Sequence, residues 1–252
     1  MGLDFNFTGR TALITGAASG IGAACARFLA DHGAERLLLV DQNESGLEAL
    51  NLPGAVIFAG DVADPALWDE VEAQAGVIHH AIANAGIAAG VAIADNSFED
   101  WRRVMGVNLD GAFLTLRTAL GLMPEGGSAV LTSSVSGLKA EPTTAAYGCS
   151  KAALIHLAKV AAKENAARGV RVNAIAPGGV DTPIWDSIPF FQNLMTETGS
   201  RNAAIDAMAK MATPSGRYAT AEEIAAQVGF LLSDMARNIT GTVLISDGGY
   251  TL

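Results

Sequence analysis

The amino-acid sequence predicts an α/β fold built on a doubly wound parallel sheet. Three observations support this prediction. Short apolar segments alternate with helical patterns along the whole chain, several of these segments are apolar on both alternating faces, and a glycine-rich turn joins the first segment to the first helix. Strands that are apolar on both faces are covered on both sides, and strand–helix alternation produces right-handed crossovers between parallel strands.

The expected strands are short and rich in leucine or β-branched residues. They cover Thr11–Thr15, Arg36–Asp41, Ala55–Ala59, Val77–Ala83, Ser128–Ser133, Val170–Ile175 and Thr242–Ile245, which gives a sheet of seven strands. Apolar residues at helical spacing predict helices over Ile21–His32, Pro65–Ala75, Phe98–Leu122, Thr144–Arg168 and Ala221–Leu232. Gly33 and Gly169 follow two of these helices, at positions typical of C-terminal caps.

Length and composition limit the class of protein. The chain has 252 residues, of which 50% are hydrophobic and 17% are charged, and its net charge is −10. These values favour one domain over residues 1–252 and exclude disordered, collagen-like and disulfide-scaffold proteins. The acidic balance, without any lysine or arginine run, argues against binding to nucleic acid or an anionic membrane.

The sequence also predicts the cellular compartment and the absence of a metal. Two cysteines imply no disulfide framework, and we find no secretory signal and no membrane-spanning segment, so we expect a soluble cytoplasmic protein. The histidines do not have the spacing of metal ligands, and no metal site is predicted.

One long segment interrupts the alternation, from Pro177 to Tyr218, between the sixth strand and the last helix. Segments of this length in compact domains are commonly functional. We predict a lid or substrate-binding element over residues 183–218, whose apolar residues include Trp185, Phe190 and Phe191. A pair of packed surface helices is an alternative with equal support. A lid of this kind would favour a hydrophobic or ring-bearing substrate.

The turn after the first strand has the spacing G-x-x-x-G-x-G. It contains Gly16, Ser19, Gly20, Ile21 and Gly22. Such a turn lets backbone N–H groups approach a pyrophosphate at a helix N-terminus, although a turn can also serve only as a connection.

A carboxylate follows at the end of the second strand. Asp41 lies 25 residues after Gly16, where it can bind the ribose hydroxyls of an adenosine. The same carboxylate would repel a 2′-phosphate, and Gln42 and Asn43 supply no cation after it. The sequence therefore favours NAD over NADP.

A tyrosine and a lysine lie four residues apart on an expected helix and so share one face. An ammonium group near Tyr147 would lower the pKa of the phenol, and Lys151 can supply it, which makes Tyr147 a candidate general acid or base. Ser134 stands at the end of the fifth strand, where a hydroxyl could bind a substrate carbonyl. Ser133 and Ser136 are alternatives for that role.

These motifs occur in order with four others: Asp61-Val62, Asn84-Ala85-Gly86, Asn108, and the run from Pro177 to Thr182. In this combination the chain resembles a short-chain dehydrogenase/reductase of the "classical" subgroup over essentially its whole length. The resemblance implies a Rossmann-type domain that binds a nicotinamide dinucleotide. One departure is Ala83, where the family often has asparagine.

The resemblance also implies a role for each matching residue. The catalytic group would comprise Asn108, Ser134, Tyr147 and Lys151. Asp61 and Val62 would line the adenine, and Asn84, Ala85 and Gly86 the nicotinamide ribose, which Lys151 would also bind. Pro177, Gly178, Val180 and Thr182 would contact the nicotinamide. Asn108 would lie at a helix irregularity that holds a water linked to the lysine, and helices near 98–122 and 143–168 would pair subunits, usually into a tetramer.

The sequence thus predicts an NAD-dependent oxidoreductase that transfers a hydride between nicotinamide and a secondary alcohol or ketone. Candidate substrate contacts are Ser136, Glu141, Trp185, Phe190 and Phe191. One alternative is reduction of a 3-oxoacyl thioester on an acyl carrier protein. Another, of a different class, is a catalytically silent dinucleotide-binding module.

Overall fold

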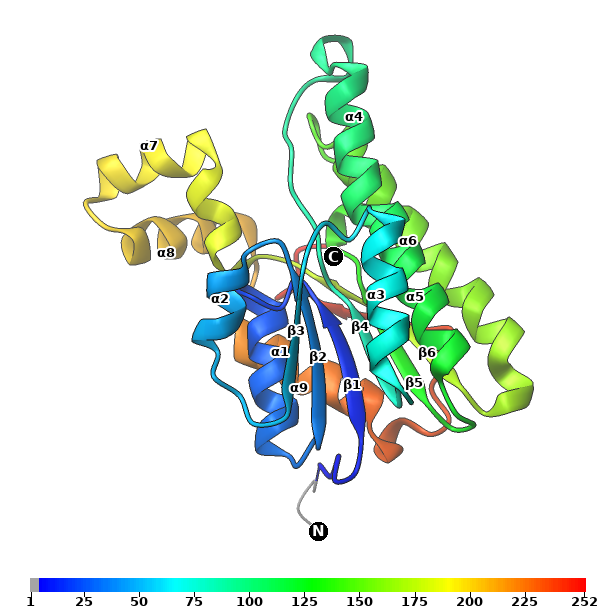
Figure 1. Ribbon diagram of the computed structural model, residues 1–252. Helices are drawn as coiled ribbons and strands as arrows, with labels where there is room; N and C mark the ends of the chain where they lie inside the picture. Colours follow the sequence, from blue (N-terminus) through cyan, green and yellow to red (C-terminus); the bar gives the residue numbers. More distant parts are fainter. Residues whose placement is uncertain (1–4) are drawn as a thin grey trace.

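The computed structural model describes residues 5–252 and contains a parallel sheet of seven strands. The strands are β1 (Thr11–Thr15), β2 (Arg36–Asp41), β3 (Ala55–Ala59), β4 (His80–Ala83), β5 (Ser128–Thr132), β6 (Arg171–Pro177) and β9 (Val243–Ser246). Their order across the sheet is β3-β2-β1-β4-β5-β6-β9. The direction of winding therefore reverses between β1 and β4, where doubly wound sheets bind ligands. The predicted fold class is confirmed (Figure 1).

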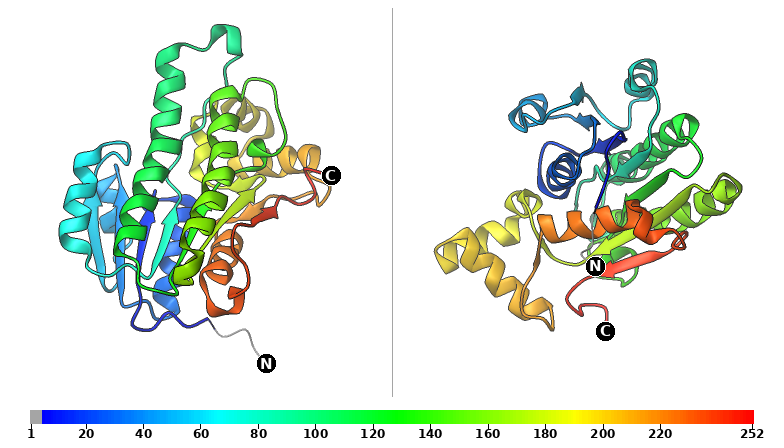
Figure 2. Two further views of the ribbon diagram at one scale, coloured as in Figure 1. Left: turned by 90° about the vertical axis from the view of Figure 1, so that its right-hand side faces the viewer. Right: turned by 90° about the horizontal axis from the view of Figure 1, so that it is seen from below.

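Helices cover both faces of the sheet (Figures 1 and 2). Helices α1 (Gly20–Asp31) and α9 (Ala221–Leu232) pack on one face, and α3 (Pro65–Ala75), α5 (Gly111–Leu122) and α6 (Ala145–Asn165) pack on the other. Alternate strand residues enter the two cores: Leu13 packs in the core that contains Trp68, and Ile14 packs in the core that contains Ile224. Within residues 5–252, none of the helices combines the length and apolar character needed to cross a membrane.

Strands β5, β6 and β9 differ from their predicted bounds by one or two residues, and three other elements differ further. Strand β4 begins at His80 rather than Val77, because the Ile78 N–H is bound by the Leu122 carbonyl and Val77 is exposed. The long helix predicted over 98–122 is divided into α4 (Phe98–Met105), a π-helical turn (Gly106–Asp110) and α5. A short helix, α2 (Glu44–Ala49), was not predicted, although Asn43 caps it by accepting a bond from the Gly46 N–H.

The 183–218 segment is mostly helical. It contains a 3₁₀ turn (Pro183–Ser187), α7 (Pro189–Thr198) and α8 (Arg201–Ala212), which Ser200 caps by accepting a bond from the Ala203 N–H. The two helices share a small core of their own and project from the rest of the chain, at the upper left of Figure 1. The packed-helix alternative is therefore what the structure contains; whether the segment closes over a substrate stays a prediction.

Candidate active site

The glycine-rich turn packs against the end of β4. Gly16 has a positive φ of 66°, and a Cβ atom there would lie 2.9 Å from the Ala85 Cα. A Cβ on Gly22 would lie 2.0 Å from the Gly16 carbonyl oxygen. The Asn84 amide crosses the same gap and donates to the carbonyls of Thr15 and Gly16 at 3.1 and 3.3 Å. Only glycine fits this close approach of two backbones.

The N-terminus of α1 is open toward solvent. Ser19 is its N-cap residue and is exposed, and its side chain makes no hydrogen bond to the helix. The first N–H groups of the helix are therefore uncapped by that side chain, and the helix dipole favours an anion there. These features fit a dinucleotide pyrophosphate.

Asp41 lies beside this turn. Its carboxylate accepts bonds from the N–H groups of Ala18 and Asn43, both at 3.0 Å. These bonds fix both oxygens at the end of β2 and leave acceptor capacity on each of them. The arrangement fits the ribose hydroxyls of an adenosine.

Asp61 and Val62 follow β3 and form the next part of the same edge. Asp61 accepts a bond from the Ala63 N–H at 2.9 Å, and the Val62 carbonyl accepts one from the Trp68 indole at 2.9 Å. The Val62 side chain is buried against Gly111. These contacts give the pair a fixed conformation near the predicted adenine position.

Tyr147, Lys151 and Ser134 come together at the carboxyl end of β5. The Lys151 ammonium donates to the Thr132 carbonyl at 2.8 Å and lies 5.6 Å from the centre of the Tyr147 ring. The hydroxyls of Tyr147 and Ser134 are hydrogen-bonded to each other. The buried Ser133 hydroxyl instead donates to the Lys151 carbonyl at 2.7 Å. Of the two neighbouring serines, Ser134 is therefore the one that meets Tyr147.

The electrostatics of this group differ from the sequence prediction. Burial raises the pKa of Tyr147, and the hydrogen bond from Ser134 opposes that rise. Burial also lowers the pKa of Lys151 to about 8. The expectation that the lysine lowers the Tyr147 pKa is wrong for the protein alone, because desolvation of the phenol is the largest influence on it. Tyr147 is therefore a protonated phenol at neutral pH.

Asn108 lies in the π-helical turn and is fully buried. Its amide binds the backbone of Ile87 and donates to the Ser150 hydroxyl at 3.1 Å. A Cβ on Gly86 would lie 3.2 Å from the Lys151 ammonium and 3.3 Å from the Asn108 amide oxygen. The predicted ribose-binding residues and the predicted catalytic residues thus meet at Gly86.

The run after β6 closes the opposite side of the site. The Gly178 N–H donates to the Ser246 carbonyl at 2.9 Å, and a Cβ on Gly178 would lie 2.8 Å from the Asp247 Cα. Thr182 is buried, and its methyl group would lie 3.3 Å from a Cβ on Gly20. The chain from Pro177 to Thr182 therefore reaches the glycine-rich turn.

Two of the predicted substrate contacts have other partners in the structure, and both stay predictions. Phe191 is fully buried in the core between α7 and α8. Glu141 accepts a hydrogen bond from the Tyr250 hydroxyl at 2.7 Å, so its carboxylate is bound by the C-terminal tail. Sequence reasoning missed Tyr250, because nothing in the local pattern connects residues 109 positions apart.

The other three candidates have different surroundings. The Trp185 indole donates to the Val180 carbonyl at 2.7 Å and stacks on Tyr218, with ring centres 5.7 Å apart. Trp185 therefore attaches the 183–218 segment to the run after β6. Phe190 is 60% exposed, and the Ser136 N–H donates to the Ser134 hydroxyl. Phe190 and Ser136 stay predictions.

Comparison with known proteins gives the family. Residues 16–251 match the family model described as enoyl-(acyl carrier protein) reductase. The chain belongs to the short-chain dehydrogenase/reductase family. It is 37% identical to cis-4-hydroxycyclohexanecarboxylate dehydrogenase of Sinomonas cyclohexanicum, with 97% of this chain and 98% of the relative covered. It is 40% identical to D-threitol dehydrogenase of Mycolicibacterium smegmatis, with 99% and 95% covered.

The solved structures agree with the sequence comparison. A short-chain type dehydrogenase/reductase from Mycobacterium marinum superposes with a TM-score of 0.85 at 30% identity, covering 98% of each chain. This short-chain dehydrogenase/reductase is thus an oxidoreductase of the alcohol and ketone class that uses a nicotinamide dinucleotide. The predicted family and reaction class are confirmed.

Proposed function

We propose that this short-chain dehydrogenase/reductase interconverts a secondary alcohol and its ketone with NAD(H). The observation that carries the proposal is the hydrogen-bonded pair Tyr147 and Ser134, which stands beside the Lys151 ammonium at the ends of the strands. A neutral phenol and a serine hydroxyl can together bind one carbonyl oxygen, and the phenol can then protonate it.

In this mechanism the dinucleotide supplies hydride-transfer chemistry when it is bound. In the reductive direction Ser134 donates a hydrogen bond to the ketone oxygen, and Tyr147 gives its proton to that oxygen as negative charge develops on it. Because the raised pKa keeps Tyr147 protonated, its hydroxyl can donate this proton at neutral pH. In the oxidative direction the same oxygen of Tyr147 accepts the alcohol proton, and the nearby Lys151 ammonium stabilises the resulting phenolate.

Lys151 and Asn108 support these two hydroxyls. Lys151 is held by the Thr132 carbonyl, and Asn108 is held by Ile87 and Ser150. The Ser150 hydroxyl in turn donates to the Tyr147 carbonyl at 2.7 Å. A chain of hydrogen bonds therefore runs from Asn108 to the backbone of Tyr147, and we propose that it fixes the helix turn that carries the phenol.

NAD is proposed over NADP because of Asp41. Its carboxylate is fixed beside the glycine-rich turn, where a 2′-phosphate would meet negative charge. A hydrophobic or ring-bearing alcohol is the proposed substrate, and the cyclic alcohol in the name of one relative supports this choice.

A second candidate is reduction of the 3-oxo group of a 3-oxoacyl thioester carried by an acyl carrier protein. The name of a 34% identical relative from Thermotoga maritima, 3-oxoacyl-[acyl-carrier-protein] reductase, favours it, and the description of the family model also names a reductase of carrier-bound acyl groups. The net charge of −10 and the Asp41 carboxylate both weigh against it, because carrier proteins are acidic and such reductases commonly use NADPH. A silent binding module is disfavoured because all four residues of the proposed catalytic group are present.

We also propose that the protein is a homo-oligomer, with a tetramer favoured over a dimer. Large apolar side chains are exposed on the outer faces of α5 and α6, at Phe113 and Val160, 49% and 39% exposed respectively. Pairing of these helices across two-fold axes would cover them. Light scattering after size exclusion gives the mass directly.

The test of the function is a turnover assay with the purified protein. NAD and NADP are each offered with cyclic secondary alcohols and open-chain polyols, NADH and NADPH are each offered with a 3-oxoacyl thioester, and absorbance at the nicotinamide band is followed. We expect turnover with NAD and a cyclic alcohol. Preference for the thioester with NADPH would establish the second candidate, and dinucleotide binding without turnover of any substrate would establish a silent module.

A further inference from the structure

The 183–218 segment leaves and rejoins the fold at one place. Strand β7 (Val180–Asp181) lies immediately before it and pairs in parallel with β8 (Ala219–Thr220) immediately after it. The partners are Val180 with Ala219 and Asp181 with Thr220. Because Val180 and Thr182 are proposed nicotinamide contacts, movement of the segment about the β7–β8 pair would move those contacts as well.

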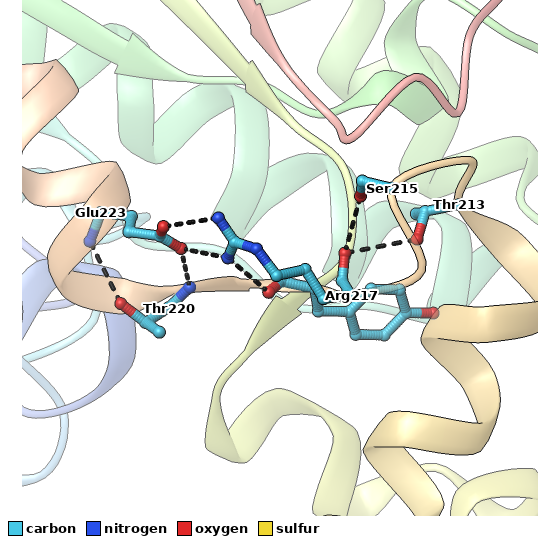
Figure 3. Close-up of polar contacts among 6 residues, drawn as sticks. Thr213, Ser215, Arg217, Thr220 and Glu223 are labelled. Carbon is cyan, nitrogen blue, oxygen red and sulfur yellow. Dashed lines mark hydrogen bonds and ion pairs between the residues drawn. The ribbon is translucent and has the colours of Figure 1, made fainter.

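The exit from the segment is fixed by a dense set of local bonds (Figure 3). Arg217 forms two bonds of 2.7 Å with Glu223, and Glu223 also accepts the Thr220 N–H in a capping box at the start of α9. The hydroxyls of Thr213 and Ser215 both donate to the Arg217 carbonyl. These contacts join residues close in sequence, so the exit holds its own conformation.

The entry to the segment is bound by the Arg201 side chain, in addition to the Trp185 indole described above. Arg201, the first residue of α8, uses three different nitrogen atoms. Its Nε donates to Asp186 at 2.8 Å, one Nη donates to Asp181 at 2.5 Å, and the other Nη donates to the Thr182 carbonyl at 2.9 Å. The guanidinium therefore joins α8 to β7, to the residue after it and to the 3₁₀ turn.

One of these acceptors leads directly to the proposed cofactor site. Thr182 is 8% exposed, and its methyl group would lie 3.3 Å from a Cβ on Gly20 in the glycine-rich turn. The next residue, Pro183, would lie 4.0 Å from the same Cβ. The Arg201 guanidinium thus binds the carbonyl of Thr182, and the side chain of Thr182 packs against the glycine-rich turn.

We propose that Arg201 is a positioning residue for dinucleotide binding, which sets Thr182 against the glycine-rich turn and holds the 183–218 segment in register with it. The inference rests on the proposed function and adds a residue to its machinery. Arg201 itself contacts no reacting atom. Its role requires the planar fork of a guanidinium, because three acceptors in three directions cannot be reached together by the compact ammonium of a lysine.

The experiment compares the variants R201M and R201K with R103M in the full-length protein. Arg103 forms an exposed pair with Asp100 at 3.3 Å on α4, remote from the segment, so R103M is a matched control for loss of a surface ion pair. Three quantities are measured: the Kd for NADH by fluorescence titration, the KM for NAD with kcat, and the rate of limited proteolysis within residues 183–218 without dinucleotide.

For R201M we expect the Kd for NADH and the KM for NAD to rise about tenfold, with kcat changed by less than about threefold. Cleavage within the segment should become several times faster. R201K should recover little of the affinity, because charge alone does not restore the three bonds. R103M should match the wild type. If R201M does not fold, D186N removes one acceptor charge and should raise the Kd for NADH about threefold.

An affinity for NADH within twofold of the wild type in R201M would overturn the inference, and so would full recovery in R201K. A fall in kcat with unchanged Kd would also overturn it, since it would place Arg201 in the chemical step. If the wild type itself binds neither NADH nor NADPH, the proposed function fails first. The proteolysis rates in that case still show whether Arg201 holds the segment.

Discussion

Asn108 binds both polar groups of the Ile87 backbone. Its amide nitrogen donates to the Ile87 carbonyl at 3.0 Å, and its amide oxygen accepts the Ile87 N–H at 2.8 Å. The pair joins the π-helical turn after α4 to the chain that leaves β4, and the same amide reaches Ser150 on α6. One fully buried side chain therefore sets the spacing of three elements around the proposed active site.

We expect Asn108→Ala to destabilise the protein and lower its activity. The substitution leaves a buried N–H and a buried carbonyl without their partner, which costs about 2 kcal/mol or more in the free energy of unfolding. Urea denaturation measures that loss, and turnover under stabilising conditions measures the effect on the site. Asn193→Ala, at an exposed position on α7, is the control and should leave both unchanged. Equal stability of the two variants would contradict a structural role for the hydrogen bonds of Asn108.

Tyr147→Phe should abolish turnover while dinucleotide binding survives. The variant keeps the ring and loses the hydroxyl that meets Ser134, so the proton donor is removed without a change of shape. We expect kcat to fall by about 10²–10⁴-fold, with a Kd for NADH within a few-fold of the wild type. Tyr218→Phe keeps the stacking on Trp185 and serves as the matched control. Near-normal turnover in Tyr147→Phe would contradict the assignment of Tyr147 as the proton donor.

Asp41→Ala should weaken NAD binding and relax discrimination against NADP. The carboxylate that accepts the Ala18 and Asn43 N–H groups would no longer bind the ribose or repel a phosphate. The ratio of kcat/KM for the two cofactors measures the change, and we expect it to fall by about tenfold or more. Asp64→Asn, which keeps the cap of α3, is the control. An unaltered ratio would show that discrimination lies elsewhere.

Acid should destabilise the fold through His80. This side chain is buried, its Nδ1 lies 2.9 Å from the Ser128 hydroxyl, and burial with nearby Arg10 lowers its pKa to about 3. Between pH 6.5 and about 3 the unfolded chain binds a proton that the folded chain does not. Stability from this group is therefore present above pH 6.5 and is lost as the pH falls, by up to about 1.4 kcal/mol per pH unit.

His80→Gln tests the origin of that acid dependence. The variant should be less stable at pH 7 and should lose less stability than the wild type between pH 7 and pH 5, measured by urea denaturation at each pH. His156→Gln, at an exposed position on α6, should retain the wild-type slope. Identical pH slopes in all three proteins would assign the acid dependence to other groups.

Much of the fold followed from local patterns in the sequence. Four of the seven strands of the sheet begin at the residue predicted, and α3 has the predicted bounds, because two-sided apolar runs and a proline at the first helical turn are strong local signals. The π-helical turn and α7 with α8 were less predictable. The π-helical turn depends on its packing against α6 and on the Asn108 bonds to Ile87 and Ser150, and α7 and α8 depend on the core that they share.

The sequence by itself determined which motifs carry the chemistry and their order along the chain: a glycine-rich turn, a strand-end carboxylate, and a tyrosine and lysine one helical turn apart. These features depend on local geometry, which residue spacing fixes. Tertiary structure alone decided which serine meets Tyr147, that Tyr250 binds Glu141, and that Arg201 gathers three acceptors around Thr182. Such contacts join residues distant along the chain, and their geometry exists only after the helices and the sheet have packed together.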